Sequence, residues 1–378
     1  MLARVYNACQ RRINKYLCDI KGFNTDRKIV VIESDDWGSV RMPSERVYNS
    51  LMKRGVRVDT CIYDKFDSLE SKEDMCLLFD LLYKFKDMNS NPAIITANSL
   101  VANPDFKKIR ESKFESYFYK DLPSSLKEEG DNCLEAWYEG IKSSVFHPQF
   151  HGREHINIKR WLSALKSGLK ELLIAFEYGT FCIGDTKKYP LFVAAFDSDN
   201  ESEYVSHLNI LDDGDRLFKN IFGYHAKSFI APNYIWNQRH ESELAKLGIS
   251  VIQGGLIQLI PQNNNKYRRS YHYTGENNIL GQTYLVRNCI FEPSANPNKD
   301  WVDSCMRQVD DAFKCNHPAI ICSHRVNFMG RIDKRNRDQN LRLLEDLLKS
   351  IILKWQNIEF MTSDQLGELI VKSKVKFN

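Results

Sequence analysis

The sequence predicts an α/β fold built on a parallel β-sheet. Short apolar or β-branched runs alternate with longer segments in which apolar residues recur at helical spacing. Two of the short runs, 29–32 and 320–322, are almost continuously apolar, as expected for strands that are covered on both faces. A barrel or a doubly wound sheet satisfies both observations.

The predicted strands are short runs of apolar and β-branched residues, separated by polar or turn-forming segments. They are 28–33, 93–97, 143–147, 192–196, 228–231, 250–253, 284–290, 319–323 and 358–361. Helices are expected where apolar residues recur every three to four positions. They are 44–54, 72–85, 156–175, 241–247, 301–315 and 340–354.

The chain is predicted to form one domain. Two polar stretches, 197–206 and 262–278, are expected to be loop insertions, because periodic apolar segments resume directly after each. Residues 28–378 show no internal repeat and are expected to make the barrel or sheet. Residues 1–27 have amphipathic helical spacing and are expected to pack on that domain.

Composition argues against several functions. The 378 residues include 53 Lys and Arg against 49 Asp and Glu, and no stretch concentrates basic residues, so nucleic-acid binding is not expected. No apolar run approaches the roughly 18 residues that span a bilayer, and the first twenty residues lack a secretory pattern, which predicts a cytoplasmic protein. The ten cysteines are scattered without a Cys-x-x-Cys pair, so reduced thiols are expected.

Polar residues gather where three of the predicted strands end. Asp35 and Asp36 follow the first strand, His147 and His151 lie at and beyond the end of the third, and His324 follows the apolar run 319–323. The carboxyl ends of parallel strands meet at one edge of the sheet, where the sites of α/β proteins lie. These side chains are therefore expected to share a site.

Two carboxylates and a histidine pair indicate a metal site. Adjacent carboxylates raise each other's pKa, and a cation beside them relieves this, although a turn cap and a surface ion pair are the alternative interpretation. His151 and His155 are four residues apart, which on a helix places both imidazoles on one face. His147 precedes a proline and is interpreted as structural, with pocket lining or exchange with His151 left open. One carboxylate and two imidazoles leave a metal with open positions for water and substrate.

The ordered motifs resemble the polysaccharide deacetylase family, the NodB-homology carbohydrate esterases, over about residues 28–370. Glu-Ser-Asp-Asp, ending in Asp36, resembles the family's Thr-Phe-Asp-Asp element. His-Gly-Arg-Glu-His, ending in His155, keeps the histidine spacing of His-Ser/Thr-x-x-His-Pro. The resemblance implies a distorted (β/α) barrel of about seven or eight parallel strands. It also implies Asp35 as catalytic base and Asp36, His151 and His155 as ligands of a divalent ion, with zinc expected.

Three later motifs continue the resemblance. Phe-Ile-Ala-Pro-Asn-Tyr is similar to the family's Phe-Arg-x-Pro-Tyr, which implies an oxyanion-binding backbone amide at Asn233 with Tyr234 beside it. Pro-Asn-Lys-Asp-Trp is similar to Asp-x-x-Asp/Ser-Trp, which implies Trp301 as a wall of the acetyl pocket. Ile-Ile-Cys-Ser-His resembles an apolar strand ending in Leu-x-His, which implies His324 as general acid.

Two partner residues of the family are missing. Ile230 stands where the family has an arginine that orients the base, and Pro297 stands where it has an aspartate that tunes the acid. Support from other residues is one interpretation, and a barrel that binds without efficient turnover is the other. The candidates for that support are Arg153, Arg287, Asp300 and Arg325.

These residues predict a metal-dependent hydrolase that removes an acetyl group from an N-acetylated sugar or glycoconjugate. Asp35 would take a proton from water activated by the ion, the Asn233 amide would bind the oxyanion, and His324 would protonate the departing amine. A catalytically weak carbohydrate-binding barrel and a metal-independent glycosidase on a similar barrel remain open as alternatives.

Overall fold

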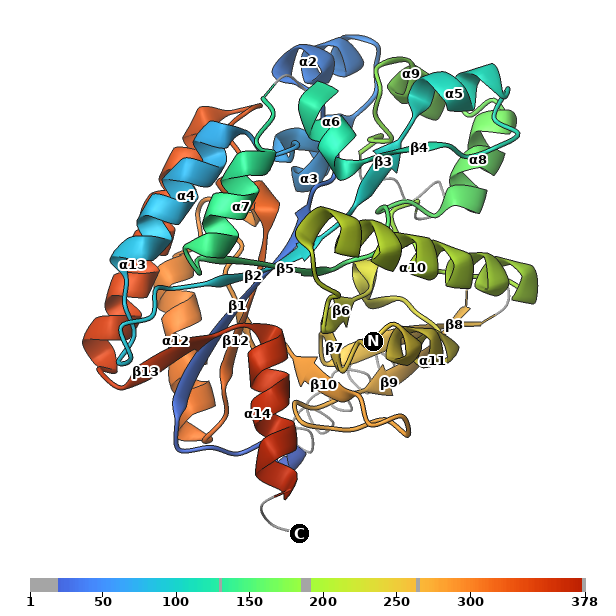
Figure 1. Ribbon diagram of the computed structural model, residues 1–378. Coiled ribbons are helices and arrows are strands. Elements are labelled where there is room, and N and C mark those ends of the chain that lie inside the picture. Colours follow the sequence, from blue (N-terminus) through green and yellow to red (C-terminus); the bar gives the residue numbers. More distant parts are fainter. Residues whose placement is uncertain (1–19, 129–130, 185–191, 263–265, 376–378) are drawn as a thin grey trace, which may run out of the picture.

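The protein is a curled parallel sheet surrounded by helices (Figure 1). The computed structural model describes residues 20–128, 131–184, 192–262 and 266–375. Within these ranges the main sheet has nine strands. All its pairings are parallel, so the predicted α/β class is confirmed.

Eight strands follow one another around the sheet, and the ninth, β13 (Ile358–Met361), pairs with β1. Their spatial order is β10 (Thr283–Val286), β7 (Val251–Gly254), β6 (Ser228–Ile230), β5 (Phe146–Phe150), β2 (Ile95–Ser99), β1 (Lys28–Trp37), β12 (Ala319–His324) and β11 (Cys289–Ile290). Two antiparallel pairs lie outside this sheet, β3 (Ala102–Pro104) with β4 (Tyr119–Asp121) and β8 (Ile257–Gln262) with β9 (Lys266–Tyr271).

A two-residue link brings the two ends of the sheet together. β10 and β11 lie at opposite ends of the strand order, yet only Arg287 and Asn288 separate them along the chain. The Arg287 amide donates to the Gly254 carbonyl of β7 and the Asn288 amide to the Ile320 carbonyl of β12, so the link continues the pairing of β10 on one side and of β11 on the other. The sheet is therefore a barrel with a seam at these two residues, as the family resemblance implies.

Side chains inside the barrel change character from one end to the other. Alternate residues of four strands, together with α14 (Ser363–Val375), form an apolar cluster made of Ile29, Val31, Val251, Leu285, Ile320, Leu366 and Ile370. Side chains on a strand share a face at every second position, so Glu33 and Asp35 continue the same row as Ile29 and Val31. The row is apolar near the amino end of β1 and acidic near its carboxyl end.

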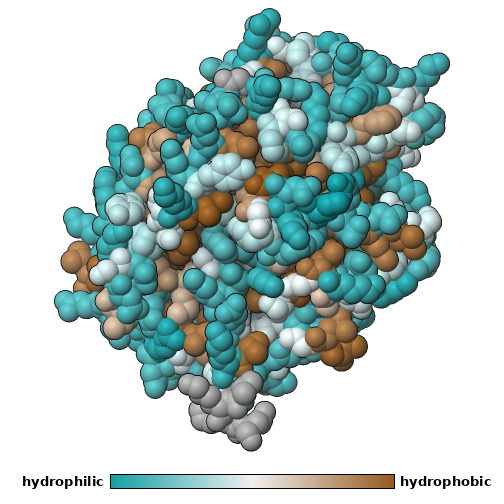
Figure 2. Space-filling view, viewed as in Figure 1, coloured by the Kyte–Doolittle hydropathy of each residue, from teal (hydrophilic) through white to brown (hydrophobic). Residues whose placement is uncertain are grey.

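Helices cover the outside, where outward side chains such as Val30 and Ile32 belong to the largest core cluster. The helices are α2 (Glu45–Lys53), α3 (Ile62–Phe66), α4 (Lys72–Lys84), α5 (Phe106–Glu111), α6 (Leu122–Glu128), α7 (Leu134–Lys142), α8 (Ile158–Lys166), α9 (Lys170–Glu177), α10 (Glu201–Phe222), α11 (Arg239–Lys246), α12 (Trp301–Lys314) and α13 (Lys334–Lys354), in addition to α14. Hydrophilic side chains dominate the face of the molecule shown in Figure 2. None of the described helices combines the length and the apolar character needed to cross a bilayer.

Several predicted elements are wrong in detail. Segment 192–196 forms turns instead of a strand, with Phe192 and Phe196 buried as loop residues. The predicted strand 284–290 is divided into β10 and β11 by the seam of the barrel. The predicted helix 156–175 is two helices, α8 and α9, separated by a turn in which Gly168 has a left-handed φ of 78°.

The two polar stretches are also more ordered than predicted. Segment 197–206 contains the start of α10, where the Asn200 side chain accepts a hydrogen bond from the Glu203 amide and caps the helix. Segment 262–278 contains β9. The predicted N-terminal helix lies for the most part outside the described residues, since these begin at Ile20, and it stays a prediction.

Arg325 holds the loop after β12 in place. It is fully buried, and its guanidinium donates to Asp67 at 3.0 and 2.9 Å, to Glu70 at 2.8 Å and to the Ser39 carbonyl at 2.9 Å. Arg325→Ala leaves two buried carboxylates without their cation. Its free energy of unfolding, measured by chemical denaturation, is expected to fall by about 3–5 kcal/mol.

Arg335→Ala is the matched control for this prediction. Arg335 also pairs with a carboxylate, Asp333 at 2.9 Å, but its side chain is 90% exposed. Exposed pairs contribute little to stability, so no measurable change is expected. Equal stabilities of the two variants would contradict the role given to Arg325.

Candidate active site

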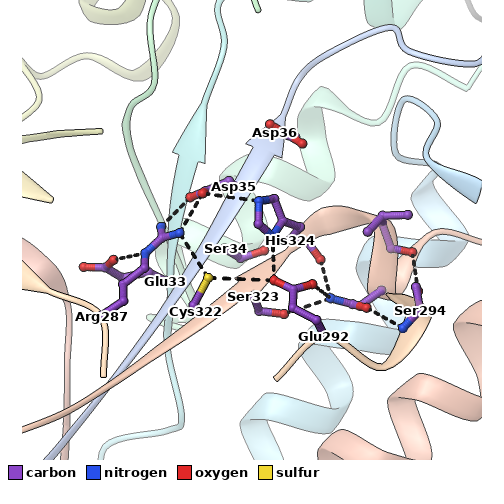
Figure 3. Close-up of polar contacts among 12 residues, drawn as sticks. Glu33, Ser34, Asp35, Asp36, Arg287, Glu292, Ser294, Cys322, Ser323 and His324 are labelled. Atoms are coloured by element: carbon purple, nitrogen blue, oxygen red, sulfur yellow. Dashed lines mark hydrogen bonds and ion pairs between the residues drawn. The ribbon is translucent and has the colours of Figure 1, made fainter. Parts of the chain in front are cut away.

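Asp35 and Asp36 face different partners because β1 is irregular where it ends. The register between β1 and β2 shifts between Ser34 and Trp37, and Asp36 has a left-handed φ of 74°. Consecutive side chains of a regular strand point to opposite faces, and a bulge breaks this alternation. Both carboxylates consequently line one cavity of about 430 Å³. Their side chains diverge from each other, as Figure 3 shows. A strained aspartate is typical of a functional position.

Two histidines converge on Asp36. Its Oδ1 lies 3.3 Å from His151 Nε2 and 3.1 Å from His155 Nε2, and all three residues are buried. Both histidines precede α8 and belong to the loop after β5, where Gly152 has a φ of 113°. The structure thus brings together the predicted pair, but the helical face inferred from their spacing is wrong.

The hydrogen bonding of His151 favours a bound cation. Its Nδ1 lies 2.9 Å from the Ile230 carbonyl, which can only accept, so Nδ1 carries the proton and Nε2 presents a lone pair. Nε2 is buried, has no hydrogen-bond partner among the described residues and faces a carboxylate oxygen. In a neutral His151 these two atoms are both acceptors, and a cation bound between them would turn the contact into a favourable one.

The spacing of these atoms fits a small divalent ion. Ligand atoms around a tetrahedral zinc, each bound at about 2.0–2.1 Å, lie about 3.3 Å from one another. The observed separations from Asp36 Oδ1 are 3.3 and 3.1 Å. One carboxylate and two imidazoles are also a common zinc donor set in hydrolases, so the residues fit the ion that the resemblance implies.

Arg41 lies beside the other oxygen of Asp36. Its Nη1 is 3.8 Å from Asp36 Oδ2, and the guanidinium is fixed by Asp64 at 3.1 Å and by the ring of Tyr63, 5.0 Å away. Burial alone would raise the pKa of Asp36, but the two histidines hold it well below its ordinary range. Asp36 is therefore an ionised carboxylate with one oxygen turned toward the histidines.

Asp35 is held by an arginine from the seam of the barrel. Arg287 donates to both Asp35 oxygens, at 2.6 and 2.7 Å, and to Glu33 at 2.6 Å (Figure 3). Asn98 also donates to Asp35, at 2.7 Å. Burial opposes ionisation of Asp35, but Arg287 and then His324 lower its pKa far below the ordinary range. Arg287 thus keeps Asp35 charged and oriented. The family's arginine would have this role, but Ile230 stands at its position in this chain.

The other three residues that could have replaced the missing partner residues do not contact Asp35. Arg153 pairs with Glu154 at 2.7 Å and with Asp213 at 2.9 Å. Asp300 caps α12, and Arg325 holds the loop described above. Of the four residues that the sequence offered, only Arg287 contacts Asp35.

His324 is paired with a residue that the sequence analysis missed. Its Nδ1 lies 2.5 Å from Glu292 Oε1, and its Nε2 lies 3.6 Å from Asp35 Oδ2. Burial alone would lower the pKa of His324, but Glu292 and then the two aspartates raise it to about 9. Glu292 comes two residues after β11, so the strand-end rule that singled out Asp35 and His324 could have found it.

Replacing Glu292 is expected to move the alkaline limb of the pH–rate profile. His324 has a raised pKa and carries its proton at neutral pH, and it loses this proton as the pH rises through about 9. In Glu292→Gln the largest raising charge is absent, so this loss is expected at lower pH. The measurement is the pH dependence of kcat/KM in both proteins. An unmoved alkaline limb would contradict a role for the Glu292–His324 pair in activity.

The remaining predicted residues divide between the cavity and the core. Asn233 and Tyr234 line the cavity and have left-handed φ values of 59° and 56°. Trp301 does not line it, because it begins α12 in the main core and donates to the Asn296 carbonyl. His147 pairs with Asp364 at 3.2 Å and stacks on Tyr224, as expected of a structural histidine.

The ion-pair network around the cavity has more carboxylates than cations. Its carboxylates are Glu33, Asp35, Asp36, Asp64 and Glu292, and its cations are Arg41, Arg287 and protonated His324. Burial lowers the pKa of His155. A divalent cation held by Asp36, His151 and His155 would offset part of this excess of negative charge.

No protein-family model and no curated protein sequence matches the chain. Among solved structures it is similar to a 4-alpha-glucanotransferase from Thermococcus litoralis, with 9% identity and a TM-score of 0.45 over 90% of this chain and 40% of that one. It is also similar to a protein described as a polysaccharide deacetylase from Mycobacterium smegmatis, with 8% identity and a TM-score of 0.45 over 93% of both chains. A variant of the peptidoglycan deacetylase PdaC from Bacillus subtilis has 10% identity and a TM-score of 0.37 over 93% of this chain and 94% of that one. The chain thus spans less than half of the glucanotransferase and nearly all of the two deacetylases.

Proposed function

We propose that the protein is a metal-dependent deacetylase that removes an acetyl group from an N-acetylated sugar or glycoconjugate. The observation that carries this proposal is the convergence of Asp36, His151 and His155 in the cavity that Asp35 and His324 also line. A ligand group, an ionised carboxylate and a protonated imidazole in one cavity are the parts that hydrolysis of an amide requires.

Asp36, His151 and His155 would hold the ion, for which zinc is the best fit. When bound, a divalent ion polarises a carbonyl oxygen and lowers the pKa of water. Asp35, held by Arg287, accepts the proton of the attacking water. His324 presents Nε2 toward Asp35 and the cavity and gives its proton to the departing amine nitrogen, while Glu292 stabilises the imidazolium.

The surroundings of Asp35 and His324 support turnover over binding alone. Both partner residues that the motifs lack are replaced by residues from the β10–β11 region, Arg287 for the base and Glu292 for the acid. Arg287 orients the carboxylate that would accept the proton, and Glu292 raises the pKa of the imidazole that would donate one, so both replacements serve proton transfer. The cavity of about 430 Å³ is within the usual size range of small-ligand sites.

Metal analysis combined with acetate release tests the proposal. The purified protein is expected to contain about one divalent ion per chain by elemental mass spectrometry, and to release acetate from N-acetylated sugar oligomers. A chelator should abolish release, and added Zn²⁺ should restore it. Asp36→Ala and His151→Ala should each lose the ion.

Three outcomes would contradict the proposal. Unchanged metal content in both variants would show that the ligands are assigned wrongly. An intact metalloprotein that releases no acetate from the oligomers would favour the carbohydrate-binding alternative, and hydrolysis of the glycosidic bond without metal would favour a glycosidase.

A further inference from the structure

A second group of metal-ligating side chains lies behind the acid His324. We infer that Glu292, Cys322 and His324 form a separate site for a soft divalent ion, Zn²⁺ or Cd²⁺, and that its occupancy inhibits the enzyme. The inhibition rests on the proposed function, because it acts through His324. The metal site itself does not depend on that function.

The barrel register places these three side chains together. Cys322 and His324 are alternate residues of β12 and share its inward face. β11 pairs with β12 in parallel, with Ile290 opposite Cys322, so Glu292 emerges beside His324. Glu292 Oε1 lies 2.5 Å from His324 Nδ1 and 3.8 Å from Cys322 Sγ (Figure 3). One ligand atom from each residue lies within 4.8 Å of the other two.

The donor set selects the class of ion. Thiolate, imidazole and carboxylate are the three protein ligands of zinc. A thiolate favours Zn²⁺ and Cd²⁺ over Mg²⁺ and Mn²⁺, which prefer oxygen ligands. The apolar strand motif that β12 resembles has leucine at the position of Cys322, so the thiol is a feature of this chain.

Binding would leave the charge of the buried network unchanged. The Cys322 S–H bond and the His324 Nδ1–H bond break, bonds from sulfur and nitrogen to the ion form, and two protons leave to solvent. One dication thus replaces two protons without any oxidation or reduction. The remaining Nε2–H belongs to a neutral imidazole, a much weaker acid than the imidazolium, so the proton needed by the leaving amine is withheld.

The second site shares no ligand with the first, which uses Asp36, His151 and His155. The two ions can therefore be bound at the same time. With one equivalent of metal per chain, the ion at the first site would support turnover. With excess metal, a further ion at the second site would stop it.

Titration of the metal-free, full-length protein with Co²⁺ tests the site without any assay of activity. The second equivalent is expected to produce the near-ultraviolet charge-transfer band of a Co²⁺–thiolate bond. Cys322→Ala should lose this band and still bind the first equivalent. Cys61→Ala is the matched control, because Cys61 lines the cavity but lies outside the group, and it should keep the band.

Acetate release in excess metal tests the inhibition. Each rate is compared with the same protein's rate at one equivalent of Zn²⁺. Excess Zn²⁺ is expected to slow the natural protein and Cys61→Ala by at least about tenfold, and Cys322→Ala should need at least about tenfold more Zn²⁺ for the same effect. Excess Mg²⁺ should not inhibit.

The results separate failure of the site from failure of the function. Absence of the thiolate band in the natural protein, or its persistence in Cys322→Ala, would overturn the second site. Equal zinc inhibition of the natural protein and Cys322→Ala would overturn the inhibitory role. A Cys322-dependent band in a protein that releases no acetate would support the site and count against the deacetylase.

Discussion

The Asp35→Asn variant is expected to keep its divalent ion and to release acetate about 10²–10⁴-fold more slowly than the natural protein. Asparagine has the shape of aspartate but cannot accept the proton of the attacking water. Asp35 pairs with Arg287, while the ligand group is centred on Asp36, so the ion should stay. The measurements are kcat for acetate release and metal content by elemental mass spectrometry.

Asp36→Asn is the matched control for this variant. Both histidines approach the Asp36 carboxylate, so the Asp36→Asn protein is expected to lose most of its bound ion along with its activity. Loss of metal from Asp35→Asn, with retention in Asp36→Asn, would reverse the roles of the two aspartates. The bulge at the end of β1 is the reason that neighbouring residues can have separate roles.

Arg287→Met is expected to have the second large effect, on both activity and stability. It leaves Glu33 and Asp35 buried without their shared cation, so the free energy of unfolding should fall by about 3–5 kcal/mol. Arg287 keeps the pKa of Asp35 low, and burial alone would raise it. The acidic limb of the pH–rate profile should therefore move to higher pH, with loss of activity at neutral pH. Denaturation and the pH dependence of kcat/KM are the measurements.

Arg153→Met separates this positioning role from general destabilisation. Arg153 is also a buried arginine with two carboxylate partners, Glu154 and Asp213, but it does not pair with Asp35. The Arg153→Met protein should be less stable than the natural protein, but the acidic limb of its pH–rate profile should be unchanged. Arg287→Lys keeps the charge without the planar fork and should restore part of the activity lost in Arg287→Met. An Arg287→Met profile identical to that of Arg153→Met would contradict the proposed role.

The sequence predicted most residues of the site correctly, but it predicted their spatial arrangement less well. Asp36, His151 and His155 do converge, but through a loop turned at Gly152 and not through a helix. Asn233 and Tyr234 line the cavity, whereas Trp301 belongs to the core. An apolar or aromatic residue follows the same pattern whether it packs a core or lines a pocket, so only the packed structure separates the two.

Residues outside the motifs were harder to place. Arg287 could be named only as one of four candidates, since its contact with Asp35 joins residues 252 positions apart along the chain. Arg41 and Tyr63 follow β1 on loop and short-helix segments without a periodic signal. They reach the cavity because the chain folds back across the carboxyl end of the barrel.

The sequence by itself determined the α/β class and the strand ends at which chemistry-bearing side chains lie. Hydrophobic periodicity and strand-end position are local properties, and a strand carries them wherever it is placed. The tertiary structure decided where the barrel closes, which arginine holds Asp35, and that Glu292 supports His324. Each of these depends on which strands become neighbours when the sheet curls, and that choice is made by packing between segments far apart in the chain.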